Sequence, residues 1–212
     1  MNRTSFLVDG FNLYHSLRTA SDDLLGRSTK WLDLRSLLSS YLPVIGSTAT
    51  LGKIFYFSAL AVHLDQRRPG VTQRHRRYLE CLQATGVTPE LGRFKFKEVY
   101  CHTCNRVNLH YEEKETDVAI SVKLIETFQL DEADTVALVT GDTDLAPAVR
   151  TASRLFPAKR ICFAFPYKRK NKELARLVPL SFYIRKERYV AHQLPDPVVL
   201  PSGRAIHKPS SW

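Results

Sequence analysis

Val136-Ala137-Leu138-Val139-Thr140-Gly141-Asp142-Thr143-Asp144 joins a run of four apolar residues to a glycine turn that carries two aspartates. A short continuous apolar run that ends in a turn predicts a strand buried on both faces, which is typical of a parallel sheet covered by helices. The two aspartates then follow the carboxyl end of that strand, where open α/β sheets bind their ligands. Crowded carboxylates at such an edge favour a cation, and hard oxygen ligands suit Mg²⁺ or Mn²⁺.

A second apolar run near the start of the chain has the same form. Ser5-Phe6-Leu7-Val8 leads into Asp9-Gly10-Phe11-Asn12, and the helical spacing of Leu13 and Leu17 follows. Asp9 therefore repeats the placement of Asp142 at a strand end. The alternative is that Asp9 or Asn12 only caps the following helix by accepting backbone N–H bonds. The second strand-end aspartate favours a shared site.

The remaining pattern alternates between strands and helices. Buried strands are predicted over residues 53–59 and 159–164, an edge strand over 93–98, and helices over 31–42, 70–86, 145–155 and through Leu174 and Leu177. This order predicts an α/β fold of three layers, with a central parallel sheet flanked by helices. Residues 1–190 form the expected domain. Residues 191–212 are expected to be a flexible tail, since prolines and glycines there accompany no apolar period.

A third carboxylate is expected at the start of a helix. Residues 111–117 open a helix whose buried stripe would be Val118, Val122, Ile125 and Phe128, which places Asp117 in the first turn. The helix dipole alone favours one acidic residue there. Several carboxylates at one helix start indicate a positive partner, which is either Lys114 or a metal ion.

Pro147 bears on the two aspartates of the first stretch. Because proline lacks an N–H group, it must lie in the first turn of its helix, which makes Asp144 the expected cap and Asp142 the firmer ligand.

Charge is distributed unevenly along the 212 residues. Lys and Arg number 31 and Asp and Glu 21, yet residues 101–134 alone carry −5 and the rest of the chain +15. A basic body with one acidic focus is expected of a protein that attracts polyphosphate and concentrates carboxylates at a metal site; the alternative is a solvated basic surface. The residues predicted to contact nucleic acid are Arg67, Arg68, Arg74, Arg76, Arg77, Lys168, Arg169 and Lys170.

No apolar run is long enough for a membrane span and no early segment reads as a signal peptide, so a cytoplasmic protein without membrane association is expected. Four cysteines are too few for a disulfide scaffold. Cys101 and Cys104 form half of a zinc knuckle, which His102, His110 or Cys81 would have to complete. Free thiols are favoured over a zinc site, because a second Cys-x-x-Cys is missing from the sequence.

Three short motifs, in this order, resemble those of the NYN domain, a branch of the PIN-like nuclease superfamily that includes bacterial LabA-like proteins. They are Asp9-Gly10-Phe11-Asn12, Lys114-Glu115-Thr116-Asp117-Val118 and Thr140-Gly141-Asp142-Thr143-Asp144. The resemblance implies metal-dependent ribonuclease activity, with metal binding at Asp9, Asp117 and Asp142 and extending to Asp144. It also implies that Asn12 orients the first carboxylate or the scissile phosphate. Thr140 and Thr143 stand where the family often has serine, and the Cys-x-x-Cys insertion resembles one in some LabA-like relatives.

Both lines of argument predict hydrolysis of phosphodiester bonds, with Mg²⁺ or Mn²⁺ as the cofactor. The resemblance further implies an endoribonuclease, for which single-stranded RNA is expected as the substrate in preference to DNA. Lys114 is the expected supplementary cation in the transition state. Two alternatives stay open, namely a non-cleaving RNA-binding or regulatory module and a metal-dependent phosphatase. The pattern leaves open whether the protein forms a homo-oligomer.

Overall fold

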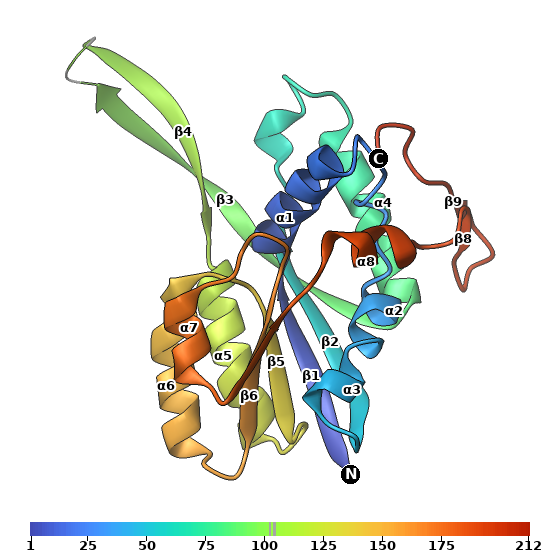
Figure 1. Cartoon of the computed structure of the whole chain (residues 1–212). Helices are drawn as coiled ribbons and strands as arrows, with labels where there is room; N and C mark the ends of the chain where they lie inside the picture. Colours follow the sequence, from blue (N-terminus) through green and yellow to red (C-terminus); the bar gives the residue numbers. More distant parts are fainter. Residues whose placement is uncertain (102, 104) are drawn as a thin grey trace.

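The computed structural model describes residues 1–101, 103 and 105–212 and contains a seven-stranded sheet with helices on both faces (Figure 1). The sheet strands are β1 (Asn2–Asp9), β2 (Ala49–Ala59), β3 (Val87–Cys101), β4 (Arg106–Lys114), β5 (Thr135–Val139), β6 (Arg160–Phe165) and β7 (Leu180–Tyr183). The helices are α1 (Gly10–Asp23), α2 (Leu34–Ser39), α3 (Leu42–Ile45), η1 (Val62–Leu64), α4 (Val71–Ala84), α5 (Thr116–Gln129), η2 (Thr143–Leu145), α6 (Ala146–Leu155), α7 (Lys172–Leu177) and α8 (Lys186–Ala191). Strands β8 (Val198–Val199) and β9 (Ala205–Ile206) form a separate hairpin.

The sheet is parallel except at one edge. Its strand order is β4-β3-β2-β1-β5-β6-β7, and only the β3–β4 pair of this sheet is antiparallel among the described residues. Each residue of β5 is buried, as expected for a strand covered on both faces. The predicted α/β class with a central parallel sheet is therefore confirmed.

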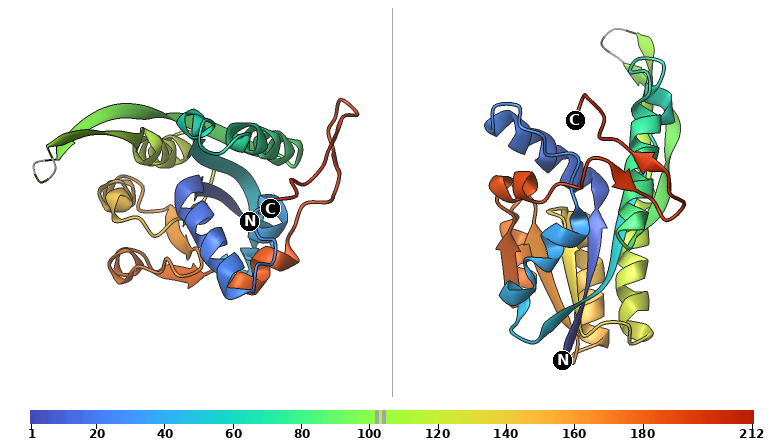
Figure 2. Two further views of the ribbon diagram at one scale, coloured as in Figure 1. Left: turned by 90° about the horizontal axis from the view of Figure 1, so that it is seen from above. Right: turned by 90° about the vertical axis from the view of Figure 1, so that its right-hand side faces the viewer.

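Alternate residues of the central strands divide the core into two layers (Figure 2). Phe6 and Val8 pack with residues of α1, α2 and α4 on one face, whereas Leu7 packs with residues of α5, α6 and α7 on the other. Phe6 is fully buried, and each large side chain buried in this way contributes about 1.5–3 kcal/mol. The two faces together fix β1 and β5 in the centre of the molecule.

The chain changes direction across the sheet between β1 and β5. From β1 it moves outward to β2 and β3, and after β4 and α5 it returns to the other side of β1 and continues to β6 and β7. Val8 lies opposite Val139 in the register, so Asp9 and Thr140 leave the sheet side by side. This is the topological switch point at which open α/β sheets bind ligands.

Strand β3 differs from the expected edge strand. Its first part pairs with β2 as far as Gly92, and from Arg93 onward it pairs with β4, which is the true edge. The pair projects from the body as a two-stranded arm, defined here as residues 93–101 and 106–114 (Figure 1). The rings and the cations that alternate over residues 93–98 therefore lie on opposite faces of this arm.

Two helix predictions were wrong in detail. The helix expected over residues 31–42 is split into α2 and α3, because Pro43 fits the first turn of α3 and starts a helix there instead of ending one. In α5, Val118 and Val122 are exposed, while Ile120, Leu124 and Phe128 face the sheet. Val122 lines a groove beside α6, and neither valine belongs to the buried stripe. None of the helices in the described residues is long and apolar enough to cross a membrane.

The segment over residues 191–212 is folded against the body, so the expectation of a flexible tail was wrong. Val198 and Ile206 of its hairpin are buried in the core layer that contains α1 and α2. The Trp212 ring lies 5.5 Å from that of Tyr78, and the indole N–H of Trp31 donates to the carbonyl of Pro195. The apolar residues of the segment are too widely spaced to show a period, although Leu194, Val198 and Ile206 are buried in the core.

We expect Ile206→Ala to lower the free energy of unfolding by about 2 kcal/mol or more, because the substitution leaves a cavity in a packed hairpin. Val199→Ala, at an exposed position of the same hairpin, is the matched control and should have little effect. Chemical denaturation of both variants measures the difference. Equal stability of the two would mean that the segment contributes nothing to the folded state.

Candidate metal centre and adjoining cavity

Three aspartates converge at the switch point. Asp9 ends β1, Asp117 lies in the first turn of α5, and Asp142 follows β5. One carboxylate oxygen from each lies within 4.8 Å of the other two. Asp9 is almost completely buried, whereas Asp117 and Asp142 are half-buried. The arrangement brings together the three carboxylates that the sequence placed at two strand ends and one helix start.

The hydroxyl of Thr140 links the carboxylate of Asp9 to the backbone of Asp142. Its Oγ1 donates to Asp9 Oδ2 over 2.8 Å and accepts the backbone N–H of Asp142 over 3.1 Å. The side chain is buried, so both bonds are shielded from water. Sequence reasoning noted only that Thr140 keeps the hydroxyl of a family serine. The contact follows from the β1–β5 register and could not be inferred from spacing alone.

Asn12 and Gly141 join the other parts of the site. Asn12 donates its backbone N–H to Asp9 Oδ1 over 2.9 Å, and its side-chain oxygen accepts the N–H of Gly141 over 3.1 Å. A Cβ on Gly141 would lie 2.0 Å from the carbonyl oxygen of Arg169, so only glycine fits there. Asp9 both caps α1 and belongs to the carboxylate cluster, so its interpretation as a helix cap and its interpretation as a site residue are compatible.

The electrostatics of the cluster disfavour ionised carboxylates. Burial raises the pKa of Asp9, as does the charge on Asp142, against the hydrogen bonds from Asn12 and Thr140. The pKa of Asp117 is raised to about 6, first by burial and then by the charges of Asp142, Asp9, Glu113 and Asp144. These charged neighbours are all acidic, so the cluster as folded lacks a matching positive charge among them. A divalent cation would supply it, and three carboxylate oxygens are a donor set that fits Mg²⁺ or Mn²⁺.

Two other candidate site residues have different placements from those expected. Asp144 is exposed and lies outside the group of three, and it is Asp142 that caps η2 by accepting the Asp144 N–H over 3.0 Å. Lys114 Nζ lies 2.8 Å from Glu112 and not in a pair with the aspartates. A residue that the sequence analysis missed is Glu113, whose carboxylate accepts the backbone N–H of Thr116 and fixes the start of α5.

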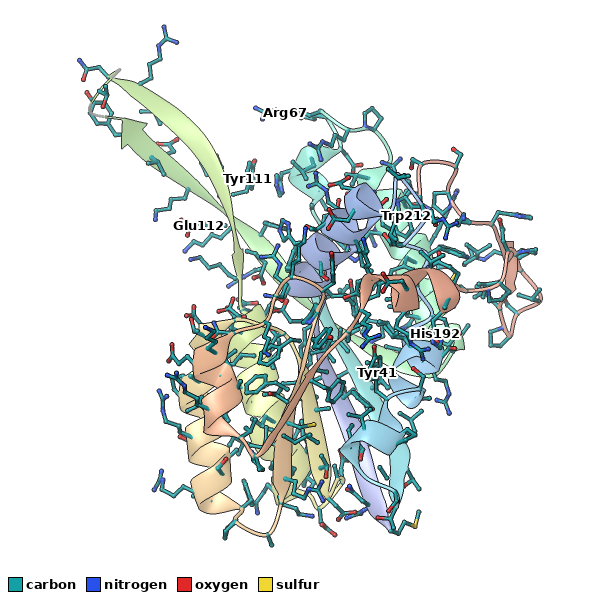
Figure 3. All side chains as sticks on the ribbon, viewed as in Figure 1. Tyr41, Arg67, Tyr111, Glu112, His192 and Trp212 are labelled. Carbon is teal, nitrogen blue, oxygen red and sulfur yellow. The ribbon has the colours of Figure 1, made fainter. Side chains whose placement is uncertain are left out.

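The predicted basic residues occupy three elements at the same edge of the sheet. Arg67 and Arg68 follow η1, Arg74, Arg76 and Arg77 lie on α4, and Lys168, Arg169 and Lys170 follow β6. Lys168 Nζ pairs with Asp23 over 2.6 Å, and the backbone of Arg169 lies against Gly141. The side chain of Arg67 lies at the outer end of its loop (Figure 3).

The zinc hypothesis concerns a region that is only partly described. Cys104 and His102, and the side chains of Cys101 and His110, lie outside the described residues. Cys81 is buried in the core on α4, where burial raises the pKa of its thiol to about 11. That thiol is part of the packing and is not an available zinc ligand.

A cavity of about 500 Å³ lies on the α1 side of the aspartates. Gly10 and Phe11, which directly follow Asp9, line it together with residues of β2, α4 and the C-terminal segment. A Cβ on Gly10 would lie 2.5 Å from the Phe57 carbonyl oxygen, so the close approach of α1 to β2 requires glycine. Sequence reasoning did not find this cavity, because its wall includes a segment that was expected to be flexible.

Comparisons with known proteins agree with this architecture. A family model described as the NYN domain matches residues 3–178. The chain is similar to 6-hydroxy-3-succinoylpyridine 3-monooxygenase HspA of Pseudomonas putida, with 25% identity over 99% of this chain and 75% of that protein. It is also similar to a solved protein of unknown function from Vibrio parahaemolyticus, with a TM-score of 0.57 and 17% identity over 87% of this chain and 93% of the other. The structural match shows a shared fold.

We expect Asp117→Asn to stabilise the metal-free protein at neutral pH and to have little effect near pH 4. The raised pKa means that folding penalises the ionised carboxyl; the penalty is absent below the ordinary pKa of 3.8, grows up to about pH 6 and is constant above it. Melting temperatures in EDTA at about pH 4 and pH 7.5 measure the difference. A stabilisation that is the same at both pH values would contradict the assigned repulsion.

Proposed function

The chain belongs to the NYN domain family, and from this premise we propose that it is a metal-dependent ribonuclease that hydrolyses phosphodiester bonds in single-stranded RNA. The observation that carries the proposal is the convergence of Asp9, Asp117 and Asp142 within 4.8 Å at the switch point. Like charges this close are costly unless a cation binds them, so the cluster is better suited to function than to stability.

Asp9, Asp117 and Asp142 would hold Mg²⁺ or Mn²⁺ through their carboxylate oxygens. When bound, such a cation acts as a Lewis acid toward a phosphoryl oxygen and lowers the pKa of water. The chain itself positions the ligands, since Thr140 and Asn12 fix Asp9 and the β5 turn by hydrogen bonds. In the proposed hydrolysis, water adds its oxygen to phosphorus, the bond to one ribose oxygen breaks, and that oxygen leaves with a proton.

The arm supports single-stranded nucleic acid as the substrate. On one face Phe94 and Tyr111 pack against His63, whose ring is stacked on Tyr111 at 4.1 Å, and Phe96 and Tyr111 stay exposed. The opposite face carries cations such as Lys97, and Figure 3 shows Tyr111 and Glu112 on opposite sides of the arm. Unpaired bases stack on exposed rings of this kind, and cations of the same element can hold the nucleic-acid backbone electrostatically.

Asp142→Asn should abolish cleavage of labelled single-stranded RNA without unfolding the protein. Asparagine still accepts the Asp144 N–H, since Asn and Asp are equally good caps, and it removes one repelling charge. We expect cleavage by the wild type to need Mn²⁺ or Mg²⁺, and we expect Mn²⁺ to raise the melting temperature of the wild type more than that of the variant.

Glu126→Gln is the control for this experiment, because Glu126 is an exposed carboxylate of α5 outside the cluster. It should retain cleavage. Cleavage that survives Asp142→Asn or EDTA would overturn the mechanism. RNA binding without cleavage by the wild type would favour the non-cleaving module instead, and hydrolysis of small phosphate esters alone would favour the phosphatase.

Reversing Arg67 and Lys170 to glutamate should weaken RNA binding and reduce the slope of log K against log salt by about 1.4, because each phosphate contact on a single strand contributes about 0.7. The matched control reverses Arg150 and Arg154, two exposed residues of α6. Binding titrations between about 50 and 200 mM salt measure both slopes. Equal slopes for the two double variants would exclude the predicted basic edge as the binding surface.

A second candidate function follows from the Pseudomonas putida relative, whose name describes oxygenation of a substituted pyridine. The observation that favours it is the cavity beside Asp9, which is lined by rings and cations. Such a reaction would consume O₂ and two electrons from an external donor such as NADH. Oxygen uptake that requires both the pyridine and NADH would support it, and its absence would exclude this second candidate.

A further inference from the structure

The cavity beside the aspartates has the size of a small-molecule site. Its volume of about 500 Å³ lies within the usual range of about 300–1,000 Å³ for ligand pockets. It lies between α1, η1 and α4, and the C-terminal Trp212 forms part of its wall (Figure 3). It lies at the carboxyl ends of β1 and β2, on the β2 side of β1. Strand β5 and the Asp142 turn lie on the other side of β1.

The charged residues that line the cavity are all basic or histidine. They are Arg18, Lys30, Arg68 and Arg74, with His15, His63 and His75, and among the described residues that line it there is no Asp or Glu. In the part of the chain that the structure describes, none of the four cations forms a salt bridge within 4.0 Å. The cavity therefore concentrates positive charge without a close ion pair, although the charge of Asp65 acts on Arg74 from outside the lining.

Burial makes part of this charge costly for the folded protein, since Lys30 and Arg74 are half-buried, whereas Arg18 and Arg68 are exposed. The pKa of Lys30 is lowered by burial and then by Arg18 and Arg74, although Asp22 opposes the shift. Burial, Arg169 and Arg18 likewise lower the pKa of His15. Cations that repel each other in a partly desolvated space are stabilised by an anion bound among them.

Aromatic rings supply the other part of the wall. Tyr78 packs edge-on against Tyr56 at 6.3 Å and against Trp212 at 5.5 Å, forming a cluster of rings on the α4 side. On the arm side, Phe11 and Phe94 meet edge to face at 5.7 Å. Rings near cations with no acidic lining residue favour a ligand that is itself aromatic and negatively charged.

We propose that this cavity is a binding site for a small aromatic anion, meaning a planar aromatic or heteroaromatic ring that carries a phosphate or carboxylate group. The ring would contact Tyr78, Trp212 and Phe11, and the anionic group would be bound by Lys30 and the neighbouring arginines. A nucleoside monophosphate and an aromatic carboxylate share this chemistry. The proposal does not depend on phosphodiester cleavage, because none of the three clustered aspartates lines the cavity.

Isothermal titration of the full chain in EDTA tests the proposal with AMP and nicotinate as anionic rings. Adenosine and inorganic phosphate serve as the ring alone and the anion alone. We expect one ligand to bind per chain, and adenosine and phosphate to bind at least about tenfold more weakly than the anionic ring, because each lacks one of the two sets of contacts. Asp142→Asn should bind as well as the wild type, which separates this site from the proposed nuclease centre.

Lys30→Met removes the half-buried charge but keeps an unbranched side chain, so it should preserve the melting temperature and weaken binding about tenfold or more. Arg150→Met, at an exposed position of α6 that does not line the cavity, is the matched control for loss of one positive charge and should bind normally. Trp212→Leu should weaken binding of the ring-bearing ligands and leave phosphate binding unchanged.

Binding of either AMP or nicotinate with this dependence supports the proposal and tells which anion the site prefers. The proposal is overturned if neither ligand binds at millimolar concentration or if Lys30→Met binds as tightly as the wild type. It is also overturned if binding requires a divalent cation and is lost in Asp142→Asn, because the ligand would then occupy the aspartate cluster.

Discussion

The parallel pairing of β1 with β5 is the constraint on which the site depends. It places Asp9 beside Thr140, and the buried hydrogen bond between them ties the ends of two strands that lie 131 residues apart in the chain. A one-residue shift in this register would turn Val8 and Val139 out of their core layer. Core packing therefore holds the carboxylates together more strongly than their own repulsion separates them.

Because the core packs separately from the repelling carboxylates, the protein can keep an unfavourable cluster of charges. The repulsion is confined to the edge of the sheet, whereas Phe6, Leu138 and Phe163 beneath it are fully buried. Each such side chain contributes about 1.5–3 kcal/mol, so a few of them offset the cost of one half-buried carboxylate with a raised pKa. The same reasoning applies to the cations of the adjoining cavity, which also lie above a packed layer.

The sequence allowed the sheet and the three aspartates to be predicted because both depend on local pattern. Apolar runs that end in Asp9 and Asp142 identify buried strands, and parallel strands expose their carboxyl ends at one edge. Features set by tertiary contacts were missed or misplaced. Lys114 pairs with Glu112, two residues earlier on the same strand β4, and residues 191–212 pack through a few apolar side chains that are too widely spaced to show a period.

The cavity and the aspartate cluster have opposite charge, and α1 separates them. Asp9 caps this helix while the next two residues, Gly10 and Phe11, line the cavity. A movement of the start of α1 would therefore change both sites, because Asn12 also bonds to Gly141 in the β5 turn. Two adjacent sites of opposite sign, joined by one turn of helix, can bind a cation and an anionic ring at the same edge of the sheet. That edge is where the fold places ligands, and here its two halves are suited to different chemical groups.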